Sequence, residues 1–568
     1  MATTLYYSVN MTGAQYIVDR LIKRGVTDAF GIPGGVILPL LYEMESRKPL
    51  FTPHLSYHEQ CAGFAACGYA QASGKIGVAY ATRGPGFTNL ITAIADAYYD
   101  SLPTLFITAH SAPCPPDGMR VMADQEMDTC SMVRNITKKA VRLDDEAKFV
   151  EIIDEALSLA TEGRKGPVFL DVASALFKKE ITCIAKEEKN IPSGEDYSKQ
   201  IDEIATAIRN AKRPIILAGD GVNQSNARVV FRQLVEKVNI PVVSSRFSHD
   251  LMAGEANYYG YVGGHGMRAA NFILSKTDMI LSLGNRLHFP PNSESYGSVM
   301  DHAKLLRVEV DENEFNRDIQ NTVNYNCDLS EILSQTLDIN CDFGNHEEWI
   351  KVCDILKTEL RNEDINPAIE SIVSILKKMD KDTIVVTDVG NNEFWVSRAA
   401  VESGCDNRVL YSKSFGALGC GLGKVIGAYY ATRKPVLCFV GDQGLQMNIQ
   451  ELQFISQHQL PIMVVVLNNR SSGMIKDREA VLFNHYVHST ADSGYQMPTL
   501  KEVVGAYGID YLAGINEIKR VQPAMLPVLV EVITDSSIGL TPSLPRGRKC
   551  QDLTPELPKE KYEYLNTL

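Results

Sequence analysis

Short apolar runs alternate with longer segments of helical period along the whole chain. The clearest runs occupy residues 77–82, 104–108, 167–172, 214–218, 278–283, 304–310, 383–387, 435–440, 461–467 and 527–533. These runs are apolar at successive positions, as the strands of a parallel sheet must be when helices cover both of its faces. The pattern therefore predicts an α/β protein built from doubly wound parallel sheets.

Two polar stretches interrupt the pattern. Residues 185–199 (AKEEKNIPSGEDYSK) are charged and contain a proline and a glycine, and residues 340–348 form a second polar stretch before a helical segment. Such stretches are typical of domain boundaries. We therefore predict three domains, at residues 1–184, 200–340 and 348–568.

Composition and charge narrow the possible functions. Apolar residues make up 45% of the chain and charged residues 22%, which is ordinary for a globular protein. The net charge of −13 argues against nucleic acid or an anionic membrane as a partner. The first residues (MATTLYYSVNMTG) have neither a basic leader nor an apolar segment, so we expect no signal peptide, and no run of 18 uncharged apolar residues suggests a membrane span. The 12 cysteines include no C-x-x-C pair, so we expect reduced thiols in a cytoplasmic protein.

Candidate metal-binding residues follow two of the apolar runs. The run at 435–440 leads into GDQG (441–444), and the run at 461–467 leads into Asn468 and Asn469. Open α/β sheets bind ligands at the carboxyl ends of their strands, and Mg²⁺ prefers oxygen ligands. Asp442, Asn469 and the turn at Ser471 could supply these oxygens, and Gly444 would let a diphosphate approach the backbone. Two ordinary strand-to-helix turns would give the same pattern, so spacing alone leaves both interpretations open.

Motifs elsewhere in the chain point to one family. They are FGIPGGVILP (30–39), YHEQC (57–61) and ATRGPGFTN (81–89), followed by TDVGNNEFW (387–395), GDQG (441–444) and LNNRSSGM (467–474). Together they resemble the thiamine-diphosphate enzymes, and most closely the acetohydroxyacid synthase (acetolactate synthase) large subunit. The resemblance extends over nearly the whole chain, and several separated motifs in the family's order are very specific.

The resemblance assigns roles to the three domains, which would be pyrimidine-binding, central and diphosphate-binding. Glu59 matches the glutamate that hydrogen-bonds the aminopyrimidine ring of the cofactor and shares a proton with it. The alternative for Glu59 is a solvated helix residue. The resemblance also implies magnesium ligands at Asp442, Asn469 and Ser471. Further contacts with thiamine diphosphate are implied for Gly34, Gly390, Asn391, Asn392, Gly416, Leu418, Gly444 and Leu445.

Other positions bear on the substrates. Gly35 and Val36 resemble the synthases' wall around the reacting keto acid, which favours pyruvate as the donor. Gln125 matches the family's catalytic glutamine. Three residues depart from or flank the family pattern near the predicted pocket: Phe87 would narrow it, Met474 would line it, and Arg478 replaces a tryptophan that selects 2-oxobutyrate. His110 also departs from the pattern, and it is either a proton relay or acceptor-site donor or a satisfied loop histidine.

The central domain is the usual place for FAD in the synthases. His265, Gly266 and Arg286 lie in segments that resemble the flavin-contacting ones, although the Asp-Asp-Arg that normally follows is replaced at residues 288–290 (HFP). We expect FAD here in a structural role, because carboligation involves no net electron transfer.

These observations predict a thiamine-diphosphate-, Mg²⁺- and FAD-binding enzyme. It would decarboxylate pyruvate and transfer the two-carbon unit to a carbonyl acceptor, as acetolactate synthase does. Two alternatives stay open within enzymes: transfer to a nucleotide-activated keto-sugar in branched deoxysugar synthesis, and simple decarboxylation of a 2-oxo acid. A non-catalytic binding protein on the same scaffold is a third. In the family the active site lies between subunits, so we expect a homodimer or homotetramer.

Overall fold

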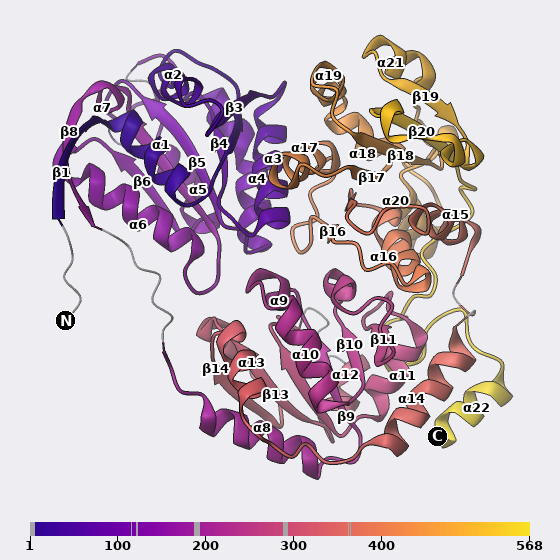
Figure 1. Ribbon diagram of the computed structural model, residues 1–568. Coiled ribbons are helices and arrows are strands. Elements are labelled where there is room, and N and C mark those ends of the chain that lie inside the picture. Colours follow the sequence, from indigo (N-terminus) through magenta and orange to yellow (C-terminus); the bar gives the residue numbers. More distant parts are fainter. Residues whose placement is uncertain are drawn as a thin grey trace.

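The chain folds into three α/β domains, each built on a six-stranded parallel sheet (Figure 1), which confirms the predicted fold class. The computed structural model describes residues 6–114, 116, 118–120, 123–186, 194–287, 294–361, 363 and 365–568. Residues 187–193 of the predicted linker at 185–199 and the whole 288–290 segment lie outside these ranges.

The first domain contains a sheet buried on both faces. Its strands, in spatial order, are β3 (Thr52–Leu55), β2 (Asp28–Gly31), β4 (Gly77–Tyr80), β5 (Thr104–His110), β7 (Pro167–Ala173) and β6 (Lys139–Leu143). One face packs against α1 (Gly13–Lys23), α2 (Leu38–Ser46) and α6 (Phe149–Thr161). The other packs against α3 (Glu59–Ser73) and α4 (Pro85–Tyr99). A two-stranded antiparallel sheet joins β1 (Tyr6–Thr12) to β8 (Glu180–Lys186).

The central domain has a different strand order. Its sheet runs β11 (Tyr258–Tyr261), β10 (Val242–Ser244), β9 (Pro214–Ala218), β12 (Met279–Leu283), β13 (Lys304–Glu309) and β14 (Thr322–Asn326). Numbered within the domain, this is the order 3-2-1-4-5-6 of dinucleotide-binding domains. The helices α8 (Ser198–Asn210), α10 (Arg228–Val238) and α13 (Leu329–Asp338) cover one face. The opposite face carries α11 (Arg268–Lys276) and α12 (Glu294–Met300).

The third domain repeats the strand order of the first. Its sheet runs β16 (Val409–Leu410), β15 (Ile384–Thr387), β17 (Val436–Gly441), β18 (Ile462–Asn468), β20 (Val528–Ile533) and β19 (Asp510–Ala513). The helices α15 (Pro367–Leu376) and α16 (Asn391–Ser403) pack on one face. The other face packs against α17 (Gly421–Thr432), α19 (Leu452–Gln457) and α21 (Leu500–Ala506).

The domain boundaries differ from the predicted ones at the end of the central domain. The helix α14 (Glu347–Leu360), which we had assigned to the third domain, packs on the central sheet, and the indole of Trp349 donates to the Pro214 carbonyl at 3.1 Å. Residues from the end of the third domain also return to the central domain. Cys550 and, in α22 (Lys559–Thr567), Leu565 are buried in the same hydrophobic core. Figure 1 shows α22 beside α14, far from the third sheet. The polar stretch at residues 340–348 therefore separates α13 from α14 within the central domain and does not end that domain.

One hydrophobic cluster joins the first and third domains. It runs from Phe106 and Phe169 of the first sheet, through α3 and α17, to Val440 and Val464 of the third sheet. The two helices approach so closely that a side chain at their contact would collide with backbone. A Cβ at Gly68 would lie 2.3 Å from the Lys424 carbonyl oxygen, and one at Gly427 would lie 1.8 Å from the Ala65 carbonyl oxygen. Glycine is therefore required at both positions.

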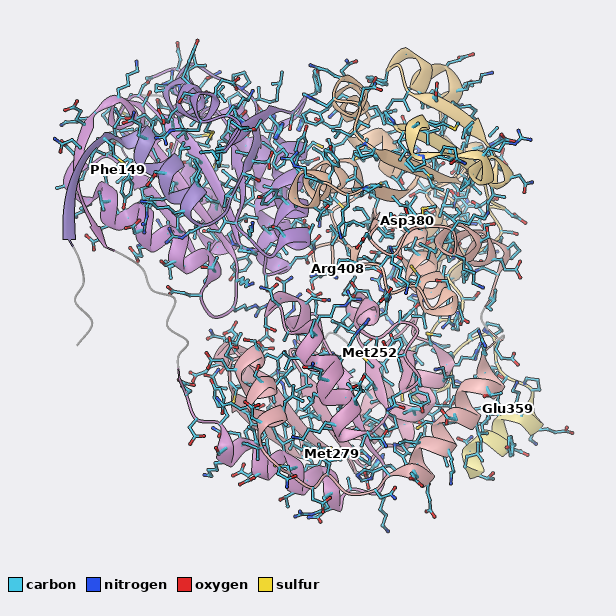
Figure 2. The ribbon with its side chains drawn as sticks, in the orientation of Figure 1. Phe149, Met252, Met279, Glu359, Asp380 and Arg408 are labelled. Carbon is cyan, nitrogen blue, oxygen red and sulfur yellow. The ribbon has the colours of Figure 1, made fainter. Side chains whose placement is uncertain are left out.

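A buried ion pair lies at this helix contact. The Lys424 Nζ is 2.9 Å from Asp96 Oδ2 and 4.0 Å from Asp100 Oδ2, and all three side chains are inaccessible to solvent. Burial alone would neutralise the amine, but the charges of Asp96 and Asp100 outweigh it and raise the pKa of Lys424. The central and third domains are joined similarly: Arg408, labelled in Figure 2 between them, lies 2.6 Å from the buried Asp250 carboxylate.

Among the described residues, no helix combines the length and the apolar character needed to cross a membrane.

We expect Lys424→Met to destabilise the chain by about 3–5 kcal/mol, because it leaves two carboxylates buried without their cation. The double variant Lys424→Met/Asp96→Asn should recover at least half of this loss, since it removes one of the stranded charges. Chemical denaturation followed by circular dichroism measures both. Lys434→Met is the control, because Lys434 pairs with Asp382 at the surface and should change stability by less than about 1 kcal/mol. A loss no larger than in that control would contradict the role of the buried pair.

Candidate functional site

The predicted metal ligands lie on neighbouring strands of the third sheet. The strand β17 ends at Gly441, and Asp442 is the first residue of α18 (Asp442–Met447). The strand β18 lies beside it, with Gly441 paired to Leu467, and Asn469 follows its end. Asp442 and Asn469 therefore leave the same edge of the sheet from adjacent strands, as their sequence positions predicted.

Asp442 is buried and lacks a cationic partner among the described side chains. Its Oδ2 accepts a hydrogen bond from the Tyr495 hydroxyl at 3.0 Å. Burial raises the pKa of Asp442 to about 6, although the hydrogen bond from Tyr495 opposes the shift. Nearby, Asn469 Oδ1 accepts from the Ser471 amide at 3.1 Å, and the buried Ser471 hydroxyl has no hydrogen-bond partner in the described part of the chain. Such a set of oxygens suits a hard cation.

Within the described ranges, no group of three or more His, Cys, Asp or Glu side chains is arranged to hold a metal ion. A cation at Asp442 would therefore depend on amide, hydroxyl or main-chain oxygens in addition to the single carboxylate. This donor set fits Mg²⁺, which typically binds one or two carboxylates and completes its shell with phosphate and water.

A turn between β15 and α16 faces the same edge of the sheet. Gly390, with φ of 128°, adopts a backbone conformation that favours glycine, and α16 begins at Asn391. The exposed N–H groups of a helix start attract anions such as phosphate. Asn391 Oδ1 is buried without a hydrogen-bond partner among the described residues, and its Nδ2 donates to Asp477 at 3.2 Å. A Cβ at Gly473 would lie 2.6 Å from Asn469 Nδ2 and 3.0 Å from Asn391 Nδ2, so the metal and anion segments meet there.

Asp388 ties this turn to the loop before α17. Its carboxylate accepts from the amides of Val389 at 2.7 Å, Gly419 at 2.9 Å and Gly421 at 2.7 Å. Burial raises the pKa of Asp388 to about 6 against these three hydrogen bonds. In that loop Gly416 is exposed and Leu418 is half-buried, so both are available to a ligand.

Two other predicted contacts of the diphosphate lie deeper. A Cβ at Gly444 would lie 3.1 Å from Asp388 Oδ1, so this glycine packs against the carboxylate that organises the turn. Leu445 is fully buried in the core that joins the first and third domains, and its side chain faces other apolar residues rather than open space. At this position the Leu445 side chain would not reach a cofactor. The neighbouring Asn392 has a supporting place, since its Nδ2 donates to the Asp388 carbonyl at 2.6 Å.

Glu59 is the first residue of α3 and is only 8% exposed. Its Oε2 accepts from Asn89 Nδ2 at 3.0 Å, and a Cβ at Gly86 would lie 3.3 Å from Oε1. The start of α3 also meets the third domain of the same chain, because Asn448 Nδ2 donates to Gln60 Oε1 at 3.2 Å and to the Gly419 carbonyl at 2.9 Å. Glu59 is therefore a buried carboxylate next to the loop that carries Gly416 and Leu418.

The other predicted residues of the first domain divide into two groups. Gln125, whose φ is 62°, is exposed and lies against Gly84. Gly35 is also open to solvent, because a Cβ at this position would meet no other atom. Gly34 packs on the Thr82 side chain, and Val36 is half-buried against the core. Phe87 differs from the expectation: it is fully buried with its ring 5.1 Å from Phe169, so it lines no open pocket.

His110 is held by two carboxylates. Its Nε2 lies 2.7 Å from Asp144 and its Nδ1 lies 3.3 Å from Asp171, while Arg142 pairs with the same Asp171. Burial would lower the pKa of His110, but the Asp171 and Asp144 carboxylates outweigh it and raise the pKa. His110 ends β5 and both ring nitrogens face aspartates, which favours a structural histidine over the proton relay, although the buried Nδ1 has no hydrogen-bond partner of good geometry among the described residues.

The central domain carries a cavity of about 240 Å³ at its topological switch point, between the carboxyl ends of β9 and β12. Its lining includes Gly219, Gly284, Arg286, Lys165 and Lys413. Arg286 also borders an adjoining hollow of about 980 Å³.

The second predicted flavin segment lies apart from this cavity. His265 is not part of the cavity lining. Its Nδ1 instead lies 3.2 Å from the Pro542 carbonyl oxygen, and its ring centroid is 5.0 Å from that of Phe394. A Cβ at Gly266 would contact the backbone of Gly263 at 2.6 Å, so Gly266 closes a tight turn.

The predicted acceptor residues lie on α20 (Gly473–Leu482). This helix contains no buried residue: Met474 is half-buried and Arg478 is exposed. Large apolar side chains remain exposed beside them, including Val481, Leu482 and Phe483.

Sequence reasoning missed several residues of the site. Glu451 is fully buried; its Oε1 accepts from the Tyr57 amide at 2.8 Å and the His58 amide at 3.0 Å, and burial raises its pKa to about 7. Asn89 and Asp388 stood inside quoted motifs but were given no role. Tyr495 lies in a polar loop, where no sequence signal marks it.

Comparison with known proteins gives matches in all three domains. The N-terminal TPP binding domain of thiamine pyrophosphate enzymes matches residues 11–132, the central domain matches 201–336 and the C-terminal TPP binding domain matches 388–533. The acetolactate synthase large subunit of Lactococcus lactis subsp. lactis is 33% identical over 94% of this chain and 95% of its own length. The isozyme 1 large subunit of Escherichia coli is 30% identical over 94% and 96%. The probable acetolactate synthase large subunit of Methanococcus aeolicus is 31% identical over 97% of both chains.

We expect Glu451→Gln to gain stability relative to the natural chain as the pH rises. Because the pKa of Glu451 is raised from 4.5 to about 7, its carboxyl stabilises the fold fully below pH 4.5 and loses this contribution as the pH rises through 7. Between pH 4.5 and pH 8, the unfolding free energy of the variant should therefore rise relative to that of the natural chain by on the order of 3 kcal/mol. Denaturation of the cofactor-free chain at several pH values measures it. The exposed Glu45→Gln is the control, and a difference that stays flat with pH would contradict the raised pKa.

Proposed function

The chain belongs to the thiamine pyrophosphate enzyme family, and we propose that it condenses two pyruvate molecules, with loss of CO₂, to give acetolactate. The observation that carries this proposal is the similarity to acetolactate synthase large subunits along nearly the full length of both chains. A carboligase of this kind needs a cofactor site, a proton-transferring group and room for two keto acids.

The third domain fits the diphosphate and magnesium end of the cofactor. The buried Asp442 carboxylate is costly without a cation, and a magnesium ion held there would offset its charge and part of the charge of the diphosphate. Asn469 and Ser471 would complete the protein's share of the ligands, and Gly390, Asn391 and the start of α16 would receive the diphosphate. When bound, thiamine diphosphate supplies a thiazolium carbon that adds to keto groups.

The first domain and the loop before α17 would hold the pyrimidine end. Glu59, nearly buried and oriented by Asn89, would hydrogen-bond the ring nitrogen and exchange a proton with it. The Gly416 carbonyl would accept from the ring's amine, and Leu418 would support the bent shape of the cofactor. The open space at Gly35, which Val36 follows in the chain, would receive pyruvate. Gln125, exposed beside Gly84, would face the substrates.

The cavity in the central domain is the place we propose for FAD. It lies at the switch point where such sheets bind dinucleotides, and Arg286 and Lys165 suit a diphosphate, whereas Lys413 is paired with Asp220 of the same lining. The flavin would act as a structural group, because the condensation transfers no net electrons. Arg286 would contact it directly, whereas His265 and Gly266 would act only if the flavin extends beyond this cavity.

We favour a second pyruvate as the acceptor. Arg478, whose charge would suit a nucleotide-activated keto-sugar, is exposed, and His110, held between two aspartates, is poorly placed to protonate the intermediate that precedes aldehyde release.

The product assay tests this function directly. The purified protein with pyruvate, thiamine diphosphate, Mg²⁺ and FAD should release CO₂ and form acetolactate, identified by mass spectrometry. Glu59→Gln should bind the cofactor yet lose activity by about a hundredfold or more, because an amide cannot exchange the proton. The exposed Glu45→Gln is the control. Formation of free acetaldehyde alone would contradict the proposed reaction and indicate simple decarboxylation. Condensation only when a keto-sugar nucleotide is added would indicate that the keto-sugar is the acceptor.

Mixing inactive variants tests whether two copies of the chain share each site. Co-expressed Glu59→Gln and Asp442→Ala chains should form hybrids that regain activity, since one site of each hybrid then receives Glu59 from one subunit and Asp442 from the other. Each variant alone should stay inactive, and Asp442→Ala should also lose Mg²⁺-dependent retention of the cofactor. Hybrids without activity would show that Glu59 and Asp442 of one chain serve the same site. Cross-linked or sedimentation-purified hybrids serve as the control for assembly.

A further inference from the structure

We propose that Tyr495 is a positioning residue for the metal site, and that its hydroxyl fixes the orientation in which the Asp442 carboxylate meets a divalent cation. This inference rests on the proposed role of Asp442 as a magnesium ligand. Neither the sequence motifs nor the comparisons assign a role to Tyr495.

The contact between the two residues is direct and comes from a distant part of the chain. The Tyr495 hydroxyl donates to Asp442 Oδ2 at 3.0 Å across 53 residues of sequence. Asp442 is buried, whereas Tyr495 is half-buried and reaches it from the loop after α20. A carboxylate oxygen accepts along more than one direction, so this hydrogen bond leaves room for a cation on the same group.

The loop that carries Tyr495 is fastened beside another predicted ligand. The Ser489 carbonyl accepts from the Ser472 amide at 2.9 Å, next to Ser471, and the buried Ser489 hydroxyl donates to Glu479 of α20. Thr490 and Ser493 cap the short helix that follows, and the Tyr495 amide donates to the Thr490 carbonyl at 2.9 Å. Tyr495 therefore holds Asp442 from a frame that is itself fixed to the Ser471 turn.

This arrangement has a clear consequence for metal affinity. A carboxylate ligand that receives a hydrogen bond from a second residue is already oriented before the cation arrives, and loss of such a partner typically weakens metal binding about 10–100-fold. A phenol keeps its proton near neutral pH, so Tyr495 is a constant donor under these conditions. Removing only the hydroxyl should weaken magnesium binding while leaving the fold intact.

The test measures the Mg²⁺ dependence of cofactor binding in the full-length protein. Apo protein is titrated with Mg²⁺ at saturating thiamine diphosphate, and binding is followed by calorimetry. Tyr495→Phe should require about 10–100-fold more Mg²⁺ for half-maximal binding, with an unchanged melting temperature in the absence of cofactor.

Two controls separate orientation of Asp442 from general effects. Ser489→Ala loosens the same loop but keeps the hydroxyl on Asp442, and Tyr511→Phe removes a phenol that donates to Glu531 at the edge of the same sheet. Both should stay within about twofold of the natural chain, well below the shift expected for loss of the Asp442 partner.

Three results would overturn the proposal. The first is a Mg²⁺ dependence of Tyr495→Phe equal to that of the natural chain, while Asp442→Ala abolishes it; the proposed metal site would then stand. The second is an equal shift in Ser489→Ala, which would assign the effect to loop order. The third is unchanged Mg²⁺-dependent binding in Asp442→Ala, which would remove the metal site itself along with the role of Tyr495.

Discussion

The close packing of α3 against α17 is the contact on which the rest of the site depends. The glycines at this contact bring two backbones together, and the Lys424 cation lies beside two buried aspartates, Asp96 of α4 and Asp100 just after it. The same aspartates hold the strand that leads to Gly416: Asp96 accepts from the Ser412 hydroxyl and Asp100 from the Lys413 and Ser414 amides. The contact thus sets the distance between the start of α3, with Glu59, and the loop before α17.

Much of the fold could be predicted from the sequence, and the exceptions have identifiable physical causes. Every apolar run that we identified forms a strand of one of the three sheets. The strands we did not identify include all six sheet edges. Among these, β3, β14 and β19 are partly exposed and lack a continuous apolar run, whereas β11 and β16 are buried but only four and two residues long. The end of the central domain could not be predicted either, because α14 and α22 are joined to it by packing between segments far apart in sequence.

The candidate site shows the same division. Asp442, Asn469 and Gly390 could be found because each follows a strand in a motif of fixed order. Phe87 and His110 were harder to interpret, because their motif positions say nothing of the Phe169 ring or the two aspartates that surround them in space. Glu451 gave no signal, since a glutamate at a helix start usually faces water, and only the fold places it against the amides of Tyr57 and His58.

The return of the chain end to the central domain has a consequence for how the protein is made. The central sheet is translated before residue 330, yet part of its core is filled by Cys550 and Leu565. Domains that emerge first from the ribosome usually fold first. Here α11, α12 and α14 can cover this face early, but the places of Cys550 and Leu565 in the core stay empty until after the third sheet is translated, so the central domain reaches its final packing late.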